Sequence, residues 1–241
     1  MRRIIALTAL LLFGVPGFLT LHAQGVRPQF RPAVLGTGPD SLVNRIKTAD
    51  LLKKGQKAGA VMFCCRVSKT GEVTWSKTYR RMPDSQVLEE EVDRCLKGLT
   101  VHPAIFQHQP AEVLMFGTVI FSITHEVPEL RIFLNQDSTE MKNASDFVGP
   151  QPVFGGVSKF NGMLYPAEEA PVHLTGIVEL ALKVDALGNM QEMRVVSEDP
   201  VKYQFGEAAE LDFRGAKFIP AFRDGDPVEC STLLPVVYSR E

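Results

Sequence analysis

The residues of this chain best suited to chemistry are its four cysteines and five histidines. Only Cys95 and His102 form a cysteine-histidine pair close in sequence, and a cysteine nucleophile needs such a neighbouring base. Cys95, however, falls on the apolar face of a predicted helix, whereas His102 directly precedes Pro103, beyond the expected end of that helix. We therefore interpret Cys95 as a buried structural cysteine and not as a nucleophile.

The remaining polar patterns also give no support to catalysis. His108, His125 and His173 stand alone in expected loops or strand ends, and the run from Glu89 to Glu91 suits a solvated helix start. The sequence has no phosphate-binding loop, no Gly-x-Ser-x-Gly motif and no metal-ligand cluster. Its formal net charge is −2, and no aromatic residues interleave with basic ones, which argues against nucleic acid. We expect a protein-binding molecule that is not an enzyme and has no catalytic residue, metal ion or small-molecule cofactor.

The cysteine pattern predicts one disulfide, between Cys65 and Cys95. Cys65 belongs to the inward face of a predicted strand, and Cys95 to the apolar face of a predicted helix. Such a bond would stabilise the fold by about 3–4 kcal/mol. Two reduced, buried thiols are the alternative. Cys64 is expected to face the opposite side and Cys230 to be free, and adjacent cysteines do not suit the corners of a tetrahedral zinc site.

The first 23 residues have the pattern of a secretory signal peptide. Arg2 and Arg3 form a positive start, Ile4 to Phe13 an apolar core, and residues 21–23 (LHA) a small-residue cleavage site. We expect a periplasmic or secreted mature chain; the alternative is an uncleaved inner-membrane anchor, although the apolar run barely reaches the roughly 20 residues that span a bilayer. Residues 24–40 are rich in Pro and Gly and are predicted to form an arm.

Two similar phrases, "VHPAIFQHQPAE" and "FIPAFRDGDPVE", indicate an internal repeat. Pro220 follows Pro103, and Pro227 follows Pro110, by the same 117 positions. The offset also aligns turn-forming glycines: Gly59 with Gly176, Gly71 with Gly188, and Gly98 with Gly215. We interpret the pattern as two copies of one supersecondary unit. Coincidence between two unrelated α+β segments is the alternative.

Each copy is predicted to fold as β-β-α-β, a small antiparallel sheet covered by one helix, which gives the protein an α+β fold. The two predicted domains, residues 41–125 and 151–241, are expected to be separate and compact. A helix over Ser41–Lys54 is expected to lead into the first domain. A linker at residues 126–150 joins the domains, and its polar middle, "NQDSTEMKNASD", indicates a loop.

Seven stretches of the second copy carry a family resemblance. They are "PVFGG" at 152–156, "YPAEEA" at 165–170, "GIVELALKVDALGN" at 176–189, "MRVVSEDP" at 193–200, "FIPA" at 218–221, "GDPVE" at 225–229 and "LPVVY" at 234–238. Jointly and in this order they are similar to the C-terminal domain of TonB-type energy transducers. The first copy is expected to be a divergent example of the same domain.

The resemblance implies a style of binding rather than energy transduction. Transducers of this family usually carry an N-terminal membrane helix and a long Pro-rich spacer, whereas the arm here has fewer than 20 residues and spans at most about 60 Å. We expect a periplasmic module that pairs an edge strand with an outer-membrane receptor or other envelope partner, linked to TonB-dependent transport. The alternative is an envelope structural protein that self-associates, for example as a homodimer, without receptor binding.

The last strand, around Ser231 to Tyr238, is predicted to be a sheet edge. Pro235 lies within it and has no N–H to donate, and prolines in sheets are confined mainly to edges, strand starts and bulges. In the resembled family the corresponding strand pairs with a short receptor peptide through its backbone. The expected partner-binding residues are Ser231, Leu233, Pro235, Val236 and Val237. The alternative is that Pro235 only ends the pairing and the interdomain segment covers the edge.

Overall fold

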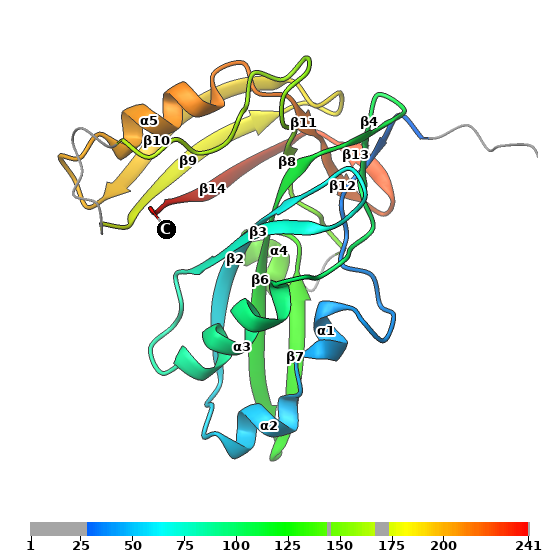
Figure 1. Cartoon of the computed structure of the whole chain (residues 1–241), viewed down its shortest axis with the longest axis vertical. Helices are drawn as coiled ribbons and strands as arrows, with labels where there is room; N and C mark the ends of the chain where they lie inside the picture. The colour runs from blue at the N-terminus through cyan, green and yellow to red at the C-terminus, as the bar shows by residue number, and fades with distance from the viewer. Residues whose placement is uncertain (1–27, 144–145, 167–173, 241) are drawn as a thin grey trace, which may run out of the picture.

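The computed structural model describes residues 28–143, 146–166 and 174–240. Within these residues the fold is α+β and contains a four-stranded and a three-stranded antiparallel sheet (Figure 1). We refer to residues 41–133 as the N-terminal unit and to residues 151–240 as the C-terminal unit. The first is coloured blue to green, with its helices and four-stranded sheet in the lower part of Figure 1, and the second reaches red above it. The predicted signal peptide lies outside the described residues.

The sheet of the N-terminal unit has the strand order β3-β2-β6-β7. Its strands are β2 (Gly59–Val67), β3 (Val73–Tyr79), β6 (Val113–Thr124) and β7 (Val127–Phe133). Alternate apolar side chains of β2 pack into a core with the buried face of helix α3 (Gln86–Leu96), as the two sequence periods predict. In this unit the helix therefore covers one face of the sheet.

The helix predicted over Ser41–Lys54 is broken into two. Helix α1 (Leu42–Arg45) ends at Ile46, which is extended, and helix α2 (Thr48–Lys53) begins two residues later. The break allows Leu42, Ile46 and Leu51 all to be buried in the same core, which a single straight helix would place around more than one face.

The described part of the predicted arm is packed onto the fold. Ala33 is fully buried, and its N–H and C=O both bond the side chain of Gln151, at 2.8 and 2.9 Å. Three short strands form a small sheet of their own: β1 (Phe30–Arg31), β4 (Ala104–Phe106) and β5 (Gln109–Ala111). The middle of this segment is thus packed into the fold and is not a free spacer.

The segment predicted as a linker at residues 126–150 contains two regular elements. Its first residues form β7, which pairs with β6 from Thr118 to Thr124, and helix α4 (Ser138–Lys142) follows. Asp137 caps α4, because its side chain accepts bonds from the N–H groups of Thr139 and Glu140. The N-terminal unit consequently has a fourth strand that the β-β-α-β prediction lacks.

The C-terminal unit has a three-stranded sheet with the order β10-β9-β14. The strands are β9 (Gly176–Val184), β10 (Met190–Asp199) and β14 (Cys230–Tyr238), and helix α5 (Phe205–Phe213) supplies apolar residues to the core on one face. A hairpin of β12 (Ala221–Arg223) and β13 (Asp226–Val228) precedes β14, and β11 (Phe218–Ile219) pairs with β8 (Gln151–Pro152).

The bounds of several elements recur at the offset of 117 residues. Strands β2, β4 and β5 coincide under this offset with β9, β12 and β13. Gly71 and Gly188 both have positive φ, of 91° and 77°, and a Cβ added to either would lie within 2.1 Å of the carbonyl oxygen of Val101 or Phe218, respectively. Both turns therefore require glycine for the same reason, namely backbone conformation together with a close backbone approach.

The two units are not separate, because they share a core. The N-terminal sheet contributes Cys64, Tyr79, Leu114 and Phe116 to the apolar cluster that contains most of the C-terminal core. No described strand of one principal sheet is inserted into the other. The principal sheets are therefore separate but their apolar contacts are continuous, so the structure does not confirm two independent compact domains.

Candidate functional site

Strand β14 is an outer strand of the C-terminal sheet. Among the described residues it pairs only with β9, and Pro235 lies opposite Glu179. In an antiparallel ladder a residue exchanges both of its backbone bonds with the residue opposite or turns both away. Since Pro235 has no N–H, we infer that it occupies a position whose C=O points toward the outer edge.

The five residues predicted to bind a partner lie on this strand but on two different faces. Ser231 and Leu233 are exposed, and Leu233 retains 51% of its accessible surface. Val236 is fully buried in the C-terminal core, so its side chain is not available to a partner. Pro235 and Val237 are also buried. The accessible side chains are thus confined to the first half of β14.

The C=O of Pro235 already has a donor from the N-terminal unit. The hydroxyl of Tyr79, at the end of β3, donates to it at 3.1 Å, and Nε2 of Gln136 donates to the same hydroxyl at 2.5 Å. Burial raises the pKa of Tyr79 well above its ordinary value, so the hydroxyl remains a donor throughout the physiological range. Sequence reasoning did not identify either residue, because the contact joins positions 156 residues apart.

Residues 134–143, which we call the strap, run beside the first half of β14. A gap of about 10 Å³ separates the strap from Thr232 to Leu234, and a larger one, of about 260 Å³, lies between α4 and the start of β14. The strap is tied to its surroundings by Asn135, whose side chain donates to the C=O of Phe147, and by an ion pair between Glu140 and Arg223 at 2.6 Å. The interdomain segment therefore covers part of the edge.

The sheet face turned away from α5 is open beside the strap. A hollow of about 710 Å³ extends over it, and its lining includes residues of both charges and an exposed apolar one, namely Asp137, Lys183, Glu192, Arg194 and Leu233. A partner strand added to β14 would direct alternate side chains toward this hollow. The mixed lining suits a peptide rather than a purely apolar ligand.

At the end of β14, Tyr238 is bonded to a buried carboxyl group. Oδ2 of Asp212 on α5 accepts from the Tyr238 hydroxyl and from the N–H of Leu164, both at 2.9 Å. Burial raises the pKa of Asp212 from 3.8 to about 6, and these two hydrogen bonds oppose that rise. The contact connects the last strand, the helix and the segment that precedes β9.

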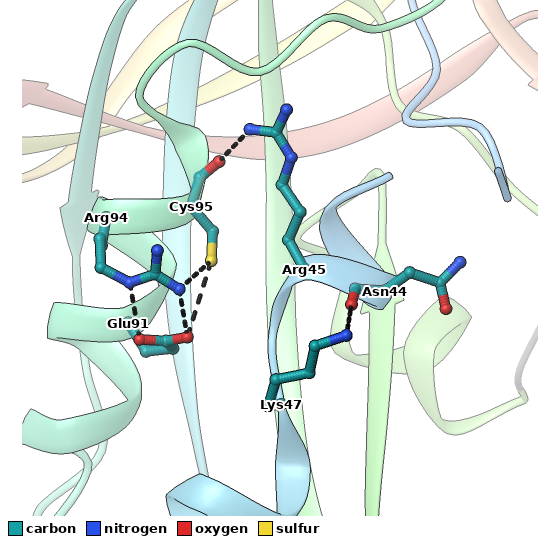
Figure 2. A network of polar contacts seen from close by, with 6 residues as sticks. All are labelled: Asn44, Arg45, Lys47, Glu91, Arg94 and Cys95. Atoms are coloured by element: carbon teal, nitrogen blue, oxygen red, sulfur yellow. Dashed lines mark hydrogen bonds and ion pairs between the residues drawn. The ribbon is translucent and has the colours of Figure 1, made fainter. Parts of the chain in front are cut away.

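The predicted disulfide between Cys65 and Cys95 is absent, since all four cysteines are free thiols. Cys65 points into the core, but the sulfur of Cys95 lies 3.2 Å from Nη2 of Arg94 and 3.8 Å from Oε1 of Glu91, along its own helix (Figure 2). Both residues belong to one apolar cluster, yet the sulfur of Cys95 contacts polar groups of its own helix and forms no bond with Cys65. Cys64 packs in the other cluster, on the opposite side of the sheet from Cys65, as expected.

The cysteines are also poorly suited to nucleophilic chemistry. Burial raises the pKa of every one of them, to about 12 for Cys65 and about 11 for Cys230. A thiol reacts as its thiolate, so these groups are protonated and unreactive at neutral pH. Within the described ranges, no three His, Cys, Asp or Glu side chains are grouped so as to hold a metal ion. In the same part of the sequence, no helix has both the length and the apolarity to cross a membrane.

Comparison with known proteins gives one match. A family model described as the C-terminal region of the Gram-negative bacterial TonB protein matches residues 161–239, which include β9 through β14. The match supports a TonB C-terminal domain in this part of the protein. It does not extend to the N-terminal unit, and therefore gives no support to a second copy. No curated protein and no solved structure gave a significant match.

Proposed function

We propose that this protein is a bacterial envelope binding protein that pairs the outer edge of β14 with an extended segment of a protein partner. The partner class that best fits the matched family is the periplasmic segment of an outer-membrane receptor, which would associate the protein with TonB-dependent transport. The proposal concerns binding and not catalysis. Backbone bonds to β14 would supply affinity, and side chains directed into the hollow beside Leu233 would supply specificity.

One observation carries this proposal: the corresponding edge of the N-terminal unit holds a strand. Under the offset of 117 residues, β6 corresponds to β14, and β7 pairs with β6 along its outer edge. The stretch Thr118–Phe121 of β6, equivalent to Pro235–Tyr238, is bonded to Leu130–Phe133. In the C-terminal sheet, no described strand takes that position. The recurring element order also supports the further proposal that the N-terminal unit is a divergent copy of the same domain.

A peptide titration tests the binding mode. We would titrate the mature protein with ten-residue peptides tiled over the periplasmic N-terminal segments of outer-membrane receptors encoded in the same genome, and follow amide shifts by NMR. The expected result is a binding peptide whose shifts centre on Ser231 to Tyr238. Shifts confined to residues remote from β14 would contradict the proposal.

A backbone-modified peptide provides the matched control. Methylating alternate backbone nitrogens of the best peptide removes backbone donors and leaves every side group in place, so pairing with β14 should be lost. Equal affinity of the methylated and unmethylated peptides would exclude strand addition. Self-association through the same edge would instead appear as concentration-dependent dimerisation in sedimentation experiments without any peptide.

A further inference from the structure

The outer edge of β14 is closed by a contact from the N-terminal unit. A strand added at this edge needs the C=O of Pro235 as an acceptor, but the hydroxyl of Tyr79 already donates to it. Tyr79 lies at the end of β3 and is buried, with 5% of its surface exposed. An incoming strand and Tyr79 therefore compete for one backbone acceptor.

Gln136 of the strap holds Tyr79 in this position. Its Nε2 lies 2.5 Å from the Tyr79 hydroxyl, on the side of the strap that faces Thr232 to Leu234. The gap between strap and strand, about 10 Å³, is at the lower limit for one water molecule. A peptide backbone cannot enter this space unless the strap or its side chains move.

The contact between Gln136 and Tyr79 leaves one buried polar atom without a hydrogen bond to any described residue. Oε1 of Gln136 is buried and has no hydrogen-bond partner among the described residues. A buried acceptor left unpaired loses its bonds to water without replacement, which destabilises the closed arrangement. Opening would return this oxygen to solvent or to an N–H of an arriving strand. Gln136 thus holds Tyr79 in place through its Nε2 and destabilises the same arrangement through its unpaired Oε1.

The opening does not require the strap to unfold. Asn135, the residue before Gln136, is fixed at both ends: its C=O accepts from the hydroxyl of Thr118 at 3.0 Å, and its side chain bonds the C=O of Phe147. On the other side, Asp137 caps α4. We therefore expect rotation of the Tyr79 and Gln136 side chains to free the acceptor, with Asn135 and α4 kept in place.

We propose that Tyr79 and Gln136 form a latch over the β14 edge, and that an extended protein segment pairs with β14 only when this latch opens. This inference rests on the proposed function of β14. It makes the N-terminal unit an inhibitor of the C-terminal one. Binding would then be set by the intrinsic affinity of the open edge multiplied by the fraction of molecules in which the latch is open.

The test compares Tyr79→Phe and Gln136→Ala with the wild-type protein and with Tyr165→Phe. Tyr165 is a matched control, because its hydroxyl also donates to a backbone carbonyl, that of Leu174, in a different part of the C-terminal unit. Hydrogen–deuterium exchange of residues 229–236 reports latch opening without any ligand. The tiled receptor peptides report affinity.

For Tyr79→Phe, we expect exchange in residues 229–236 to become about tenfold faster and the best peptide to bind about tenfold more tightly. Gln136→Ala should change both quantities in the same direction, and Tyr165→Phe should change neither. Unchanged exchange in both latch variants would overturn the latch, whatever the peptides do. Peptides that bind the wild type and the variants equally would overturn the latch alone. Faster exchange without binding of any peptide to any variant would overturn the latch as a gate together with the proposed function.

Discussion

The N-terminal and C-terminal units use one order of elements in two different ways. On the N-terminal sheet, the face opposite α3 is apolar and packs against the C-terminal unit through residues that include Leu114 and Phe116. The equivalent positions of the C-terminal unit, 117 residues later, are Ser231 and Leu233, and both are exposed. The outer edge of β6 is likewise filled by β7, whereas β14 pairs with no second described strand. The N-terminal sheet thus has a covered face and a paired edge, whereas the C-terminal sheet has an exposed face and an edge that carries no described strand.

The largest expected effect comes from the apolar face that joins the units. Phe116→Ala should lower the free energy of unfolding by about 3–4 kcal/mol, because Phe116 is 5% exposed and its loss leaves a cavity in the shared core. Leu233→Ala, at the equivalent but exposed position, should cost less than about 1 kcal/mol. Urea denaturation of both variants measures the difference. Similar costs at the two positions would break the comparison between a covered and an open face.

The two equivalent glycine turns should respond alike. Gly71→Ala and Gly188→Ala should each destabilise by about 2–3 kcal/mol, because the new Cβ would overlap a carbonyl oxygen and the residue would keep a positive φ. Gly55→Ala is the control: its φ is also positive, +81°, but the space around it is open, so about 1 kcal/mol is expected. A large effect at one turn and none at the other would show that the repeated geometry is not equally required.

The stability of the two units should depend differently on pH. Asp212 places a buried carboxyl group on the helix of the C-terminal unit, whereas the equivalent position of the N-terminal unit, 117 residues earlier, is Cys95. The pKa of Asp212 is about 6 in the folded protein and near 3.8 when it is unperturbed, so folding favours its protonated form. The stability associated with that form is present below pH 4 and is lost as the pH rises through 6. Asp212→Asn keeps an acceptor for Tyr238 and Leu164 but has no charge to desolvate.

We therefore expect Asp212→Asn to stabilise the protein by about 1–2 kcal/mol at pH 8 and to have little effect near pH 4. Thermal or urea unfolding across this range measures the change. Cys95→Ser, at the equivalent helix position, should show no comparable pH dependence, because the substitution introduces no group that titrates in this range. A gain for Asp212→Asn that is the same at pH 4 and pH 8 would assign the effect to packing instead of to ionisation.

The smallest expected effect is that of the ion pair across the two units. Nη1 of Arg80 lies 2.7 Å from Oε1 of Glu179, and the hydrogen bond from Arg80 is the main cause that lowers the pKa of Glu179. Its contribution to stability is present above the ordinary pKa of a glutamate and is lost as the pH falls below it. Arg80→Met should cost about 0.5 kcal/mol at low salt and less at 1 M salt, because the pair is partly exposed. A salt-independent cost would indicate that the arginine stem, not its charge, holds the units together.

Local patterns in the sequence were sufficient for the strands and helices that carry strong periodicity. The alternation in β2 and β9 and the helical face of α3 are both present in the structure. Strand β7 was predicted as linker, although its exposed Glu129 and Arg131 alternate with Leu130 and Ile132. A seven-residue strand beside a polar loop gives only a weak strand signal in the sequence, because its formation depends on pairing with a neighbouring strand more than on its own β propensity.

The candidate site was predictable only in part, for a different physical reason. The missing N–H of Pro235 is a property of one residue, so the sequence indicates an outer position for β14 directly. The bond from Tyr79 depends on how the two sheets pack, and the direction in which Cys95 points depends on its rotamer within the helix. Knowing which face of a strand or helix each cysteine occupies therefore places Cys65 and Cys95 in the same core, but it does not show that their sulfur atoms are close enough to form a disulfide.

The shared core has a consequence for how this protein is made. In synthesis and in export alike the N-terminal unit comes first, and Leu114 and Phe116 then have no covering surface until β14, more than 100 residues later, has followed. At ordinary rates of synthesis, 100 residues take roughly 10 s. During that time the nascent polypeptide presents an apolar sheet face of the kind that chaperones recognise, while its neighbouring edge is already protected by β7.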